Sequence, residues 1–584
     1  VLHETAPGVA PREIAYKIGH AANPDCRIID WRKAPLSRLY YEYKEGEEYS
    51  ETIQDRDRDG VIALRHTLEI VNGELTRISC RFGTFAKHDD KWVAIEHLRS
   101  RVETDDRRLP DILSLITPEQ FSLITQDAET AVMIQGIAGS GKTTVALHRL
   151  AWLLHHENSD LRSEEVLVLV FHNALREYIS HVLPALGIEG VTTVTYAEWV
   201  AKATLRALRE RYTDISQLTR PDTTAPSGVL RVKASLALLK AVEKYVADQT
   251  QRVLQHLKDA IPWSEFPTEF QQSSRAILNR TPLYIVTALS ELQHLLTLLP
   301  ASTARANAKQ VLQHSLRKAT LYHKDLTQVL NDPATICAHD ETSLLDHQLI
   351  AQAAEYTAQT LDAGHYDAGD DAIILRLYQL KHGATPLHTG GSGHYRHIVL
   401  DETQDFGTMQ LASVIGSVEQ TRQLTLVGDV NQRIDREQTF PGWEVLRKHW
   451  DLRDEMSHFV SLEISHRCTA EIMRLAEHVL GTKRALQGRS GKRPLWFECK
   501  TEEEAVSQSI DWLKKAVERF PHTLTAVICR TASEARYVLS LLTPTFGPAV
   551  RLGDEESFSF DAGIVVTDVS QVKGLEFYAA LLWN

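Results

Sequence analysis

Mainly apolar runs recur along the chain, and segments with the apolar spacing of a helix separate them. The runs at residues 131–134, 166–171, 397–400 and 424–427 each lead into polar residues or glycine. The run at 166–171 is apolar throughout, which is typical of a strand buried on both faces. Strands that alternate with helices form parallel sheets, so the pattern predicts an α/β fold with a further strand at 191–196.

After the strand predicted at 191–196, the spacing of apolar residues changes to that of a helix. Apolar residues recur every three to four positions at 229–246 and 283–299. The glycines and serine at 388–393 mark a flexible return to the sheet. We therefore expect residues 197–395 to form a long helical insertion.

A second group of apolar runs follows the first sheet. Strands are predicted at 459–464, 525–529 and 564–567, and the sequence ends within a further apolar run. We expect these strands to belong to a second α/β unit, separate from the first.

The start of the chain has the patterning of a small, mostly β module. Residues 61–70 partly alternate, Asn72-Gly73 is a hairpin turn signal, and 74–80 would form the returning strand. The charged run at 55–60 invites comparison with a calcium-binding loop, but His66 stands where the bidentate glutamate is needed. We therefore expect a solvated charged turn at 55–60.

The link between the predicted strand at 131–134 and the helical pattern after it has the spacing G-x-x-x-x-G-K-[ST]. Its residues are Gly136-Ile137-Ala138-Gly139-Ser140-Gly141-Lys142-Thr143-Thr144. Glycines let the backbone approach a phosphate without a Cβ in the way, and a helix N-terminus favours negative charge. We predict a nucleotide site in which Lys142 reaches the β and γ phosphates and Thr143 holds Mg²⁺.

Acidic residues follow two of the predicted strands, at the sheet edge where open α/β folds bind ligands. Asp401 would complete the Mg²⁺ site with Thr143, and Glu402 would orient and deprotonate the attacking water. Gln432 would sense the γ-phosphate from the same edge. Arg467 would act as an arginine finger across the cleft, or form an ordinary surface ion pair.

The net charge and the cysteines narrow the possible functions. A formal net charge of −13 argues against tight, non-specific nucleic acid binding by the whole surface, and it leaves room for a protein partner with basic channels. The six cysteines form no C-x-x-C pair, so we expect neither a disulfide framework nor a zinc site. No apolar run approaches the roughly 18 residues of a membrane span. We expect a cytoplasmic monomer without a membrane partner.

The order of these motifs resembles that of superfamily 1 helicases of the UvrD, Rep and PcrA type. The matching residues are Gln120, 136–144, Phe171-His172-Asn173, 401–405, 428–432, His466-Arg467 and 572–577. The resemblance implies ATP and Mg²⁺ as cofactors and single-stranded DNA or another nucleic acid as a partner. It also implies adenine recognition by Gln120 and a place for Glu576 near the ribose. Residues 171–174 and 193–196 resemble elements that touch single-stranded DNA, and Arg530 resembles a further family position.

The same resemblance implies the fold class and a division into four parts. The expected fold is α/β, with two RecA-like P-loop domains, a helical insertion in the first and a small β-rich N-terminal module. The parts are the module at 1–110, the first RecA-like domain at 111–196 and 396–455, the insertion arm at 197–395, and the second RecA-like domain at 456–584.

Several features depart from the UvrD-type pattern and indicate a particular branch. Arg467 and Thr567 are too close in sequence to enclose the large accessory domain of those helicases, and the insertion lies before Asp401 instead. The block at 28–35 contains D-W-R-x-A-P and looks like HelD, a helicase-like ATPase that binds bacterial RNA polymerase and dislodges nucleic acid from it. An alternative interpretation of Asp30-Trp31-Arg32 is a strand end with an arginine to carboxylate pair and a packed tryptophan.

Three functions therefore stay open. The first is a HelD-like motor whose arm engages RNA polymerase, and the second is an ordinary 3′ to 5′ DNA helicase in repair or defence. The third is a nucleotide-gated interaction protein in which binding, not turnover, sets the conformation. The last helicase motif would lie beyond the end of this sequence, so we expect weak ATP turnover by residues 1–584.

Overall fold

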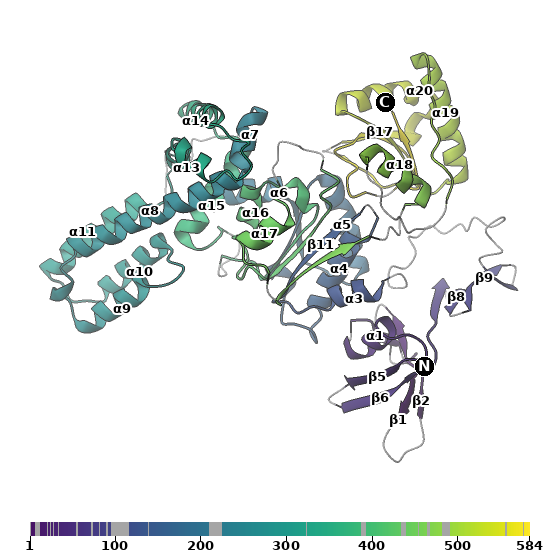
Figure 1. Cartoon of the computed structure of the whole chain (residues 1–584), viewed down its shortest axis with the longest axis horizontal. Coiled ribbons are helices and arrows are strands. Elements are labelled where there is room, and N and C mark those ends of the chain that lie inside the picture. The colour runs from purple at the N-terminus through teal and green to yellow at the C-terminus, as the bar shows by residue number, and fades with distance from the viewer. Residues whose placement is uncertain are drawn as a thin grey trace.

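The computed structural model describes residues 2–5, 12–19, 22–23, 25–26, 28–32, 34–53, 56–71, 74–80, 82–88, 91–94, 116–137, 139–209, 225–322, 324–386, 393–433, 440–453, 455–463, 468–481, 491–554, 557–575 and 577–583. Figure 1 shows a central sheet from which a helical arm, an N-terminal module and a second α/β unit extend in different directions. The predicted fold class, α/β with two parallel sheets, an inserted helical region and a β-rich start, is confirmed.

Six parallel strands form the central sheet, in the order β13-β12-β14-β15-β11-β16. They are β11 Ala131–Gly136, β12 Val166–Val170, β13 Thr192–Thr195, β14 His397–Leu400, β15 Leu424–Gly428 and β16 Ser457–Leu462. The first five match the strands predicted from the apolar runs. Because β14 pairs directly with β15, the acidic residues after these two strands lie at neighbouring positions on one sheet edge.

Helices cover both faces of this sheet (Figure 1). They are α3 Pro118–Ile124, α4 Lys142–Leu153, α5 Asn173–Ala185, α6 Tyr196–Arg209, α16 Thr408–Ile415 and α17 Trp443–His449. Alternate residues of β12 enter two different hydrophobic cores. Val168 packs in the core formed with α3, α4 and α5, whereas Leu167 and Leu169 pack in the core formed with α6, α16 and α17. The continuous apolar pattern of β12 follows from this burial on both sides.

The strand predicted at 459–464 was assigned to the wrong sheet. It forms β16, which pairs in parallel with β11 along its whole length, from Ala131 opposite Ser457 to Gly136 opposite Leu462. As an edge strand it is only partly covered: Ser457 and Leu462 at its ends are buried, and the four residues between them alternate between partly buried and exposed. Alternation of this kind reports a half-covered strand but carries no information about its partner, which here lies far away in the sequence.

Four parallel strands form the second sheet, in the order β18-β19-β17-β20. They are β17 Leu524–Cys529, β18 Val550–Gly553, β19 Gly563–Asp568 and β20 Ala579–Leu582, with helices α18 Ala470–Leu480, α19 Glu502–Arg519 and α20 Ala532–Phe546. Leu513 of α19 and Val538 of α20 pack against Val527 and Val566 of the sheet. The two predicted strands at 525–529 and 564–567 are thus confirmed as neighbours in a second α/β unit.

The described residues of the insertion form helices joined by turns and loops. It contains α7 Ser227–Ala234, α8 Leu236–Ala260, α9 Thr268–Leu278, α10 Ile285–Thr297, α11 Thr303–Ala319, α12 Lys324–Leu330, α13 Pro333–Ala338, α14 His347–Asp362 and α15 Ala368–His382. The helix predicted at 229–246 is broken at Ser235, whose side chain caps α8 by accepting from Leu238 N–H. The helix predicted at 283–299 corresponds to α10. Two separate cores hold the insertion together, one beside the sheet and one in its outer half.

The described residues of the N-terminal module form two antiparallel sheets, a two-stranded parallel pair and one helix. Its elements are β1 Leu2–Thr5, β2 Arg12–Ile14, β3 Lys17–Gly19, β4 Ile28–Asp30, α1 Ala34–Tyr41, β5 Glu48–Ile53, β6 Arg56–Ile62, β7 Thr67–Val71, β8 Glu74–Cys80, β9 Gly83–His88 and β10 Lys91–Ala94. The predicted hairpin is confirmed as β7 and β8. The charged turn predicted at 55–60 is wrong, because most of it is strand β6, where Asp57 and Asp59 are exposed while Gly60 and Ile62 are buried.

Among the described residues, no helix combines the length and the apolarity needed to cross a bilayer. All six cysteines are free thiols.

Candidate active site

The loop between β11 and α4 has the backbone geometry of an anion site. Gly141 is the N-cap of α4, with φ of 83°, and Gly139 has φ of 73°. Both values lie in the left-handed region that side chains other than glycine rarely adopt. Gly141 offers no side chain to cap the helix, so the first N–H groups of α4 stay directed toward the mouth of the loop. Together with the helix dipole they favour a phosphate group there.

Space inside this loop is limited in a way that requires glycine. A Cβ on Gly136 would lie 2.4 Å from Ser140 Oγ and 3.0 Å from Lys142 Cγ. Lys142 donates from Nζ to Gly136 O at 2.9 Å and to Ile137 O at 3.3 Å. The ammonium therefore lies against the carbonyl oxygens of the loop, at the place where its charge would meet phosphate oxygens.

Residues from two strand ends meet beside the loop. Thr143 Oγ1 donates to Asp401 Oδ2 at 2.7 Å, although 258 positions separate the two residues. A threonine hydroxyl and a carboxylate are oxygen ligands of the kind Mg²⁺ takes when substrate phosphates and water complete its shell. Within the described ranges there is no group of three or more His, Cys, Asp or Glu side chains able to hold a metal alone. The donor set therefore fits Mg²⁺ bound together with a nucleotide.

Asp401 and Glu402 are both buried at the end of β14. Burial and the neighbouring Glu402 carboxylate raise the pKa of Asp401 to about 6, against the opposing effects of the Thr143 hydroxyl, the Glu402 N–H and the Lys142 charge. Glu402 has φ of 52° and ψ of 42°, a left-handed conformation that is uncommon for a residue with a side chain. Adjacent residues of one strand end thus present two carboxylates to the same small space.

A hydrogen-bond network fixes the side chain of Glu402. Gln404 donates from Nε2 to Glu402 Oε2 at 2.5 Å and accepts from Asp429 N–H at 2.7 Å through Oε1. The Asp429 carboxylate then accepts from Gln432 Nε2 at 2.8 Å and from Gln135 Nε2 at 2.9 Å. The ends of β11, β14 and β15 are therefore joined by side-chain amides.

The second α/β unit reaches into this network through the segment after β19. Lys573 forms an ion pair with Asp405, and its Nζ lies 3.8 Å from Glu402 Oε2. Its carbonyl accepts from His172 Nε2 at 2.7 Å, because His172 Nδ1 already accepts from Leu175 N–H. Burial lowers the pKa of His172, so the ring is neutral in this contact. The two α/β units therefore meet at the carboxylates that follow β14.

Comparison with known proteins agrees with this geometry. The family model of the UvrD/REP helicase N-terminal domain matches residues 116–436, which include the loop, the insertion and the strand ends just described. The chain belongs to this family. The probable DNA helicase II homolog of Mycoplasma genitalium is 23% identical over 237 residues, which are 37% of this chain and 33% of that protein. The match thus spans about a third of the relative's length.

Gln120 of this UvrD/REP-family chain lies at the phosphate loop. Its backbone N–H and its Oε1 form a capping box with Thr117 at the start of α3. Its Nε2 donates to Ser140 O at 3.1 Å, which ties α3 to the loop. Thr144 lies in the first turn of α4, where its carbonyl is 2.8 Å from His148 Nδ1. Gln120 and Thr144 therefore lie beside the loop.

Other predicted positions are less completely placed. Arg467 and Glu576 lie outside the described residues. Gln432 follows β15 and is bonded to Asp429, on the strand next to Asp401. Arg530 follows β17 in the second unit.

Three residues of the network were not singled out by the sequence. Gln404 joins Glu402 to Asp429, Lys573 brings the second unit to the carboxylates, and Gln135 accepts from Trp443 Nε1 at 2.7 Å while it donates to Asp429. Gln135 is an amide that interrupts an otherwise apolar strand, a signal that could have found it. Gln404 and Lys573 lie inside the motifs at 401–405 and 572–577, but their partners depend on the tertiary fold.

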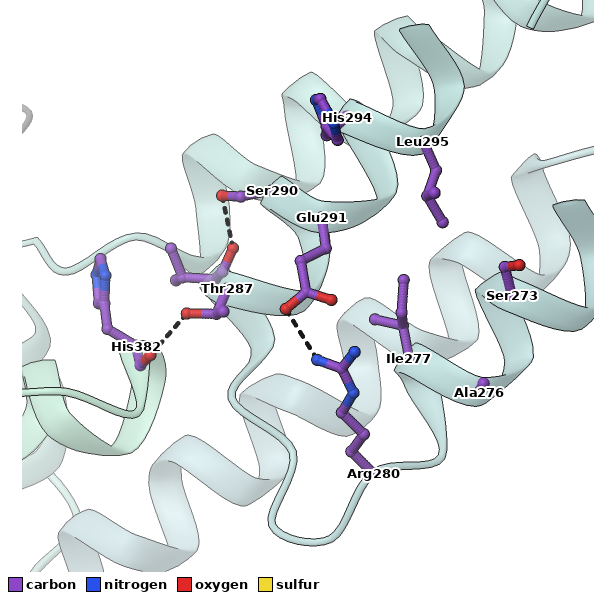
Figure 2. Close-up of a pocket in the computed structure, with 11 residues that line it drawn as sticks. Ser273, Ala276, Ile277, Arg280, Thr287, Ser290, Glu291, His294, Leu295 and His382 are labelled. Carbon is purple, nitrogen blue, oxygen red and sulfur yellow. Dashed lines mark hydrogen bonds and ion pairs between the residues drawn. The ribbon is translucent and has the colours of Figure 1, made fainter. Parts of the chain in front are cut away.

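A separate groove lies in the helical arm, between α9 and α10 and the end of α15 (Figure 2). Its volume is about 840 Å³, and Arg280 of one wall pairs with Glu291 of the other at 2.8 Å. Thr287 Oγ1 donates to His382 O at 2.6 Å at the inner end. The lining residues are Ser273, Ala276, Ile277, Arg280, Val286, Thr287, Ser290, Glu291, His294, Leu295 and His382. None of them belongs to the carboxylate network.

Proposed function

We propose that this chain works as an ATP-hydrolysing, helicase-type motor on nucleic acid or nucleoprotein complexes. The observation that supports it best is the contact between Thr143 and Asp401 beside Glu402, closed by Lys573 of the second unit. Such an arrangement combines a phosphate loop, Mg²⁺ ligands and a water-orienting carboxylate at a boundary between two units. A motor needs this combination because closure of the units must be tied to hydrolysis.

The proposed roles follow from position and chemistry. Lys142 would bind the β and γ phosphate oxygens, and Thr143 and Asp401 would hold Mg²⁺, which when bound would neutralise charge on those oxygens. Glu402 would accept a proton from the attacking water, held in place by Gln404.

Other family positions complete the proposed site. Gln120 would read the adenine edge from beside the loop, and Glu576 would lie near the ribose. Gln432 would sense the γ-phosphate through its tether to Asp429, and Arg467 would stabilise charge on the transferring group from the second unit.

Two substitutions test these roles on the full chain. Lys142→Ala is expected to abolish both ATP binding and turnover. Glu402→Gln should retain ATP and lose turnover by about 10²-fold or more, as expected for loss of a general base. Glu419→Gln makes the same chemical change at an exposed position and serves as the control. Wild-type turnover by Glu402→Gln would show that another group activates the water.

We further propose that the chain belongs to the HelD-like branch, is cytoplasmic and monomeric, and binds RNA polymerase. Between β16 and β17 the described residues hold only α18 and α19, which leaves little chain for an inserted accessory domain. The arm has a core of its own in its outer half, as expected for an element that reaches toward a partner.

Pull-down of the full-length protein from its own cytoplasm, probed for polymerase subunits, tests the branch. ATP-dependent release of nucleic acid from the polymerase complex is the expected activity. If the protein ignored polymerase but unwound 3′-tailed duplexes, an ordinary 3′ to 5′ helicase would replace the proposal, and strong stimulation of ATPase activity by single strands would point the same way.

A nucleotide-gated interaction protein is the third candidate. Full biological function in the Glu402→Gln variant, despite the loss of turnover, would favour this candidate.

A further inference from the structure

Two aromatic side chains of the N-terminal module lie in the core of the first α/β unit. Trp31 is 1% exposed and Tyr41 is 4% exposed, and both belong to the hydrophobic cluster that contains Phe121 and Leu147. The module has a small core of its own around Leu39, which includes neither of them. Trp31 and Tyr41 therefore serve the contact between the module and the unit that carries the phosphate loop.

Tyr41 packs on the helix that carries Gln120. Its ring stacks on Phe121, with centroids 4.4 Å apart and planes 16° apart. Phe121 directly follows Gln120 in α3, and Gln120 Nε2 holds Ser140 O of the phosphate loop at 3.1 Å. A shift of the Tyr41 ring would therefore displace the helix that places the Gln120 amide.

Trp31 packs on the helix that begins at the phosphate loop. Its ring lies 5.4 Å from that of His148, whose Nδ1 is 2.8 Å from Thr144 O in the first turn of α4. The backbone on either side of Trp31 is fixed. Arg32 donates to both oxygens of Asp30, at 2.9 and 2.6 Å, and its carbonyl accepts from Asn158 Nδ2 at 3.0 Å. The Asp30-Trp31-Arg32 segment is thus held by hydrogen bonds and packs against α4.

We propose that Trp31 and Tyr41 are positioning residues for the nucleotide site, so that the N-terminal module forms part of the nucleotide-binding apparatus. Neither side chain would touch the nucleotide. Tyr41 acts through α3 and Gln120, and Trp31 acts through α4 and its first turn. The proposal rests on nucleotide binding at the loop, as proposed above.

The test measures ADP affinity by titration of the full chain with a fluorescent ADP. Tyr41→Leu removes the stacked ring and is expected to weaken ADP binding roughly three- to tenfold, the effect of one lost aromatic pair. The KM for ATP should rise by the same factor with little change in kcat. Tyr41→Phe keeps the ring and should retain the wild-type affinity for ADP. Tyr41→Met is the second variant if Tyr41→Leu does not fold.

A matched control and a double mutant separate positioning from stability. Tyr43→Leu removes a ring that packs in the module's own core, so it should leave ADP affinity unchanged. In a Gln120→Ala background, Tyr41→Leu should have no further effect on ADP affinity, because it acts through that amide.

Two results would overturn the proposal, namely unchanged ADP affinity in a folded Tyr41→Leu protein or fully additive effects with Gln120→Ala. Failure of the wild-type chain to bind ADP would instead remove the proposed function, and this inference with it.

Discussion

The buried carboxyl of Asp401 destabilises the folded protein when it carries a charge. Burial and the Glu402 carboxylate raise its pKa to about 6, so the folded state keeps a proton on this group that the unfolded chain has released. Between about pH 4 and pH 6 the folded state therefore binds more protons, and the free energy of unfolding falls as the pH rises through this range. Above about pH 6 the full cost of burying the charge is present.

Asp401→Asn removes this cost while it keeps the shape of the side chain. Without Mg²⁺ at pH 7.5, we expect the variant to unfold at a temperature about 2–4 °C above that of the wild type. The difference should shrink at pH 5, where the wild-type carboxyl is mostly protonated. Thermal unfolding at the two pH values measures it. If Asp401→Asn unfolded at a lower temperature than the wild type at pH 7.5, the result would contradict the raised pKa of Asp401.

Arg149 is a buried charge that the carbonyl groups of the chain satisfy. It lies on α4 and its guanidinium donates to carbonyl oxygens at the end of α3 and in the turn before β11, including Asp127 O at 2.7 Å and Thr130 O at 3.0 Å. Its removal would leave several buried acceptors unpaired. Arg149→Met should lower the free energy of unfolding by about 3 kcal/mol in denaturant titration.

A matched arginine on the same unit provides the control for Arg149. Arg176 pairs with Glu198 in a partly accessible contact at 2.8 Å. Arg176→Met should cost less than about 1 kcal/mol. Equal effects of the two substitutions would show that the carbonyl contacts of Arg149 contribute little.

The segment after β19 connects the two α/β units through an ion pair and a close backbone contact. The side chain of Lys573 is 4% exposed and pairs with Asp405, which is itself buried. Gly574, with φ of 75°, brings the backbone so close that a Cβ would lie 3.2 Å from Glu402 Oε1. If the two units separated, Asp405 and Glu402 would lose the Lys573 ammonium. The ion pair therefore favours the closed arrangement of the units.

Lys573→Met tests this link. With the ammonium gone, we expect the units to separate more often and kcat for ATP to fall by about tenfold or more, with ADP affinity nearly unchanged. Lys573→Arg should retain part of the activity. Lys514→Met, at an exposed position of α19, is the control. Steady-state kinetics and small-angle scattering provide the two measurements, and normal kcat in Lys573→Met would exclude a role for the pair in turnover.

The sequence predicted the strands and the phosphate loop because local chemistry determines them. Apolar runs report burial, and glycines at 139 and 141 report backbone angles that need no tertiary information. The sheet to which β16 belongs, the contact of Lys573 with Asp405 and the stacking of Tyr41 on Phe121 depend on partners far away in sequence. A single sequence carries no direct signal for such pairs, so pattern alone assigned β16 to the wrong unit.

The whole molecule combines a motor-like centre with an arm that is held by separate packing. Helix α8 joins the two cores of the insertion, since Val242 lies in the core beside the sheet and Leu257 lies in the outer core with α9, α10 and α11. At 1.5 Å per residue, its 25 residues span about 37 Å. The outer half is thus a small bundle displaced from the nucleotide site, whose packing does not depend on that site.

Deletion of the outer bundle should separate partner binding from nucleotide chemistry. We expect replacement of residues 250–319 by a short Gly/Ser linker to leave ADP affinity within about twofold of wild type, because the core beside the sheet retains Val246 and Leu321 on either side of the junction. The proposed association with RNA polymerase should fall by at least about tenfold, the loss of roughly 1.4 kcal/mol or more. Parallel ADP titration and polymerase pull-down measure the two quantities. A variant in which a Gly/Ser linker replaces the loop 298–302 between α10 and α11 controls for the insertion of foreign sequence. If the deleted chain still bound polymerase normally, the contact would have to lie on the N-terminal module or on the α/β units, and the arm would act as a brace.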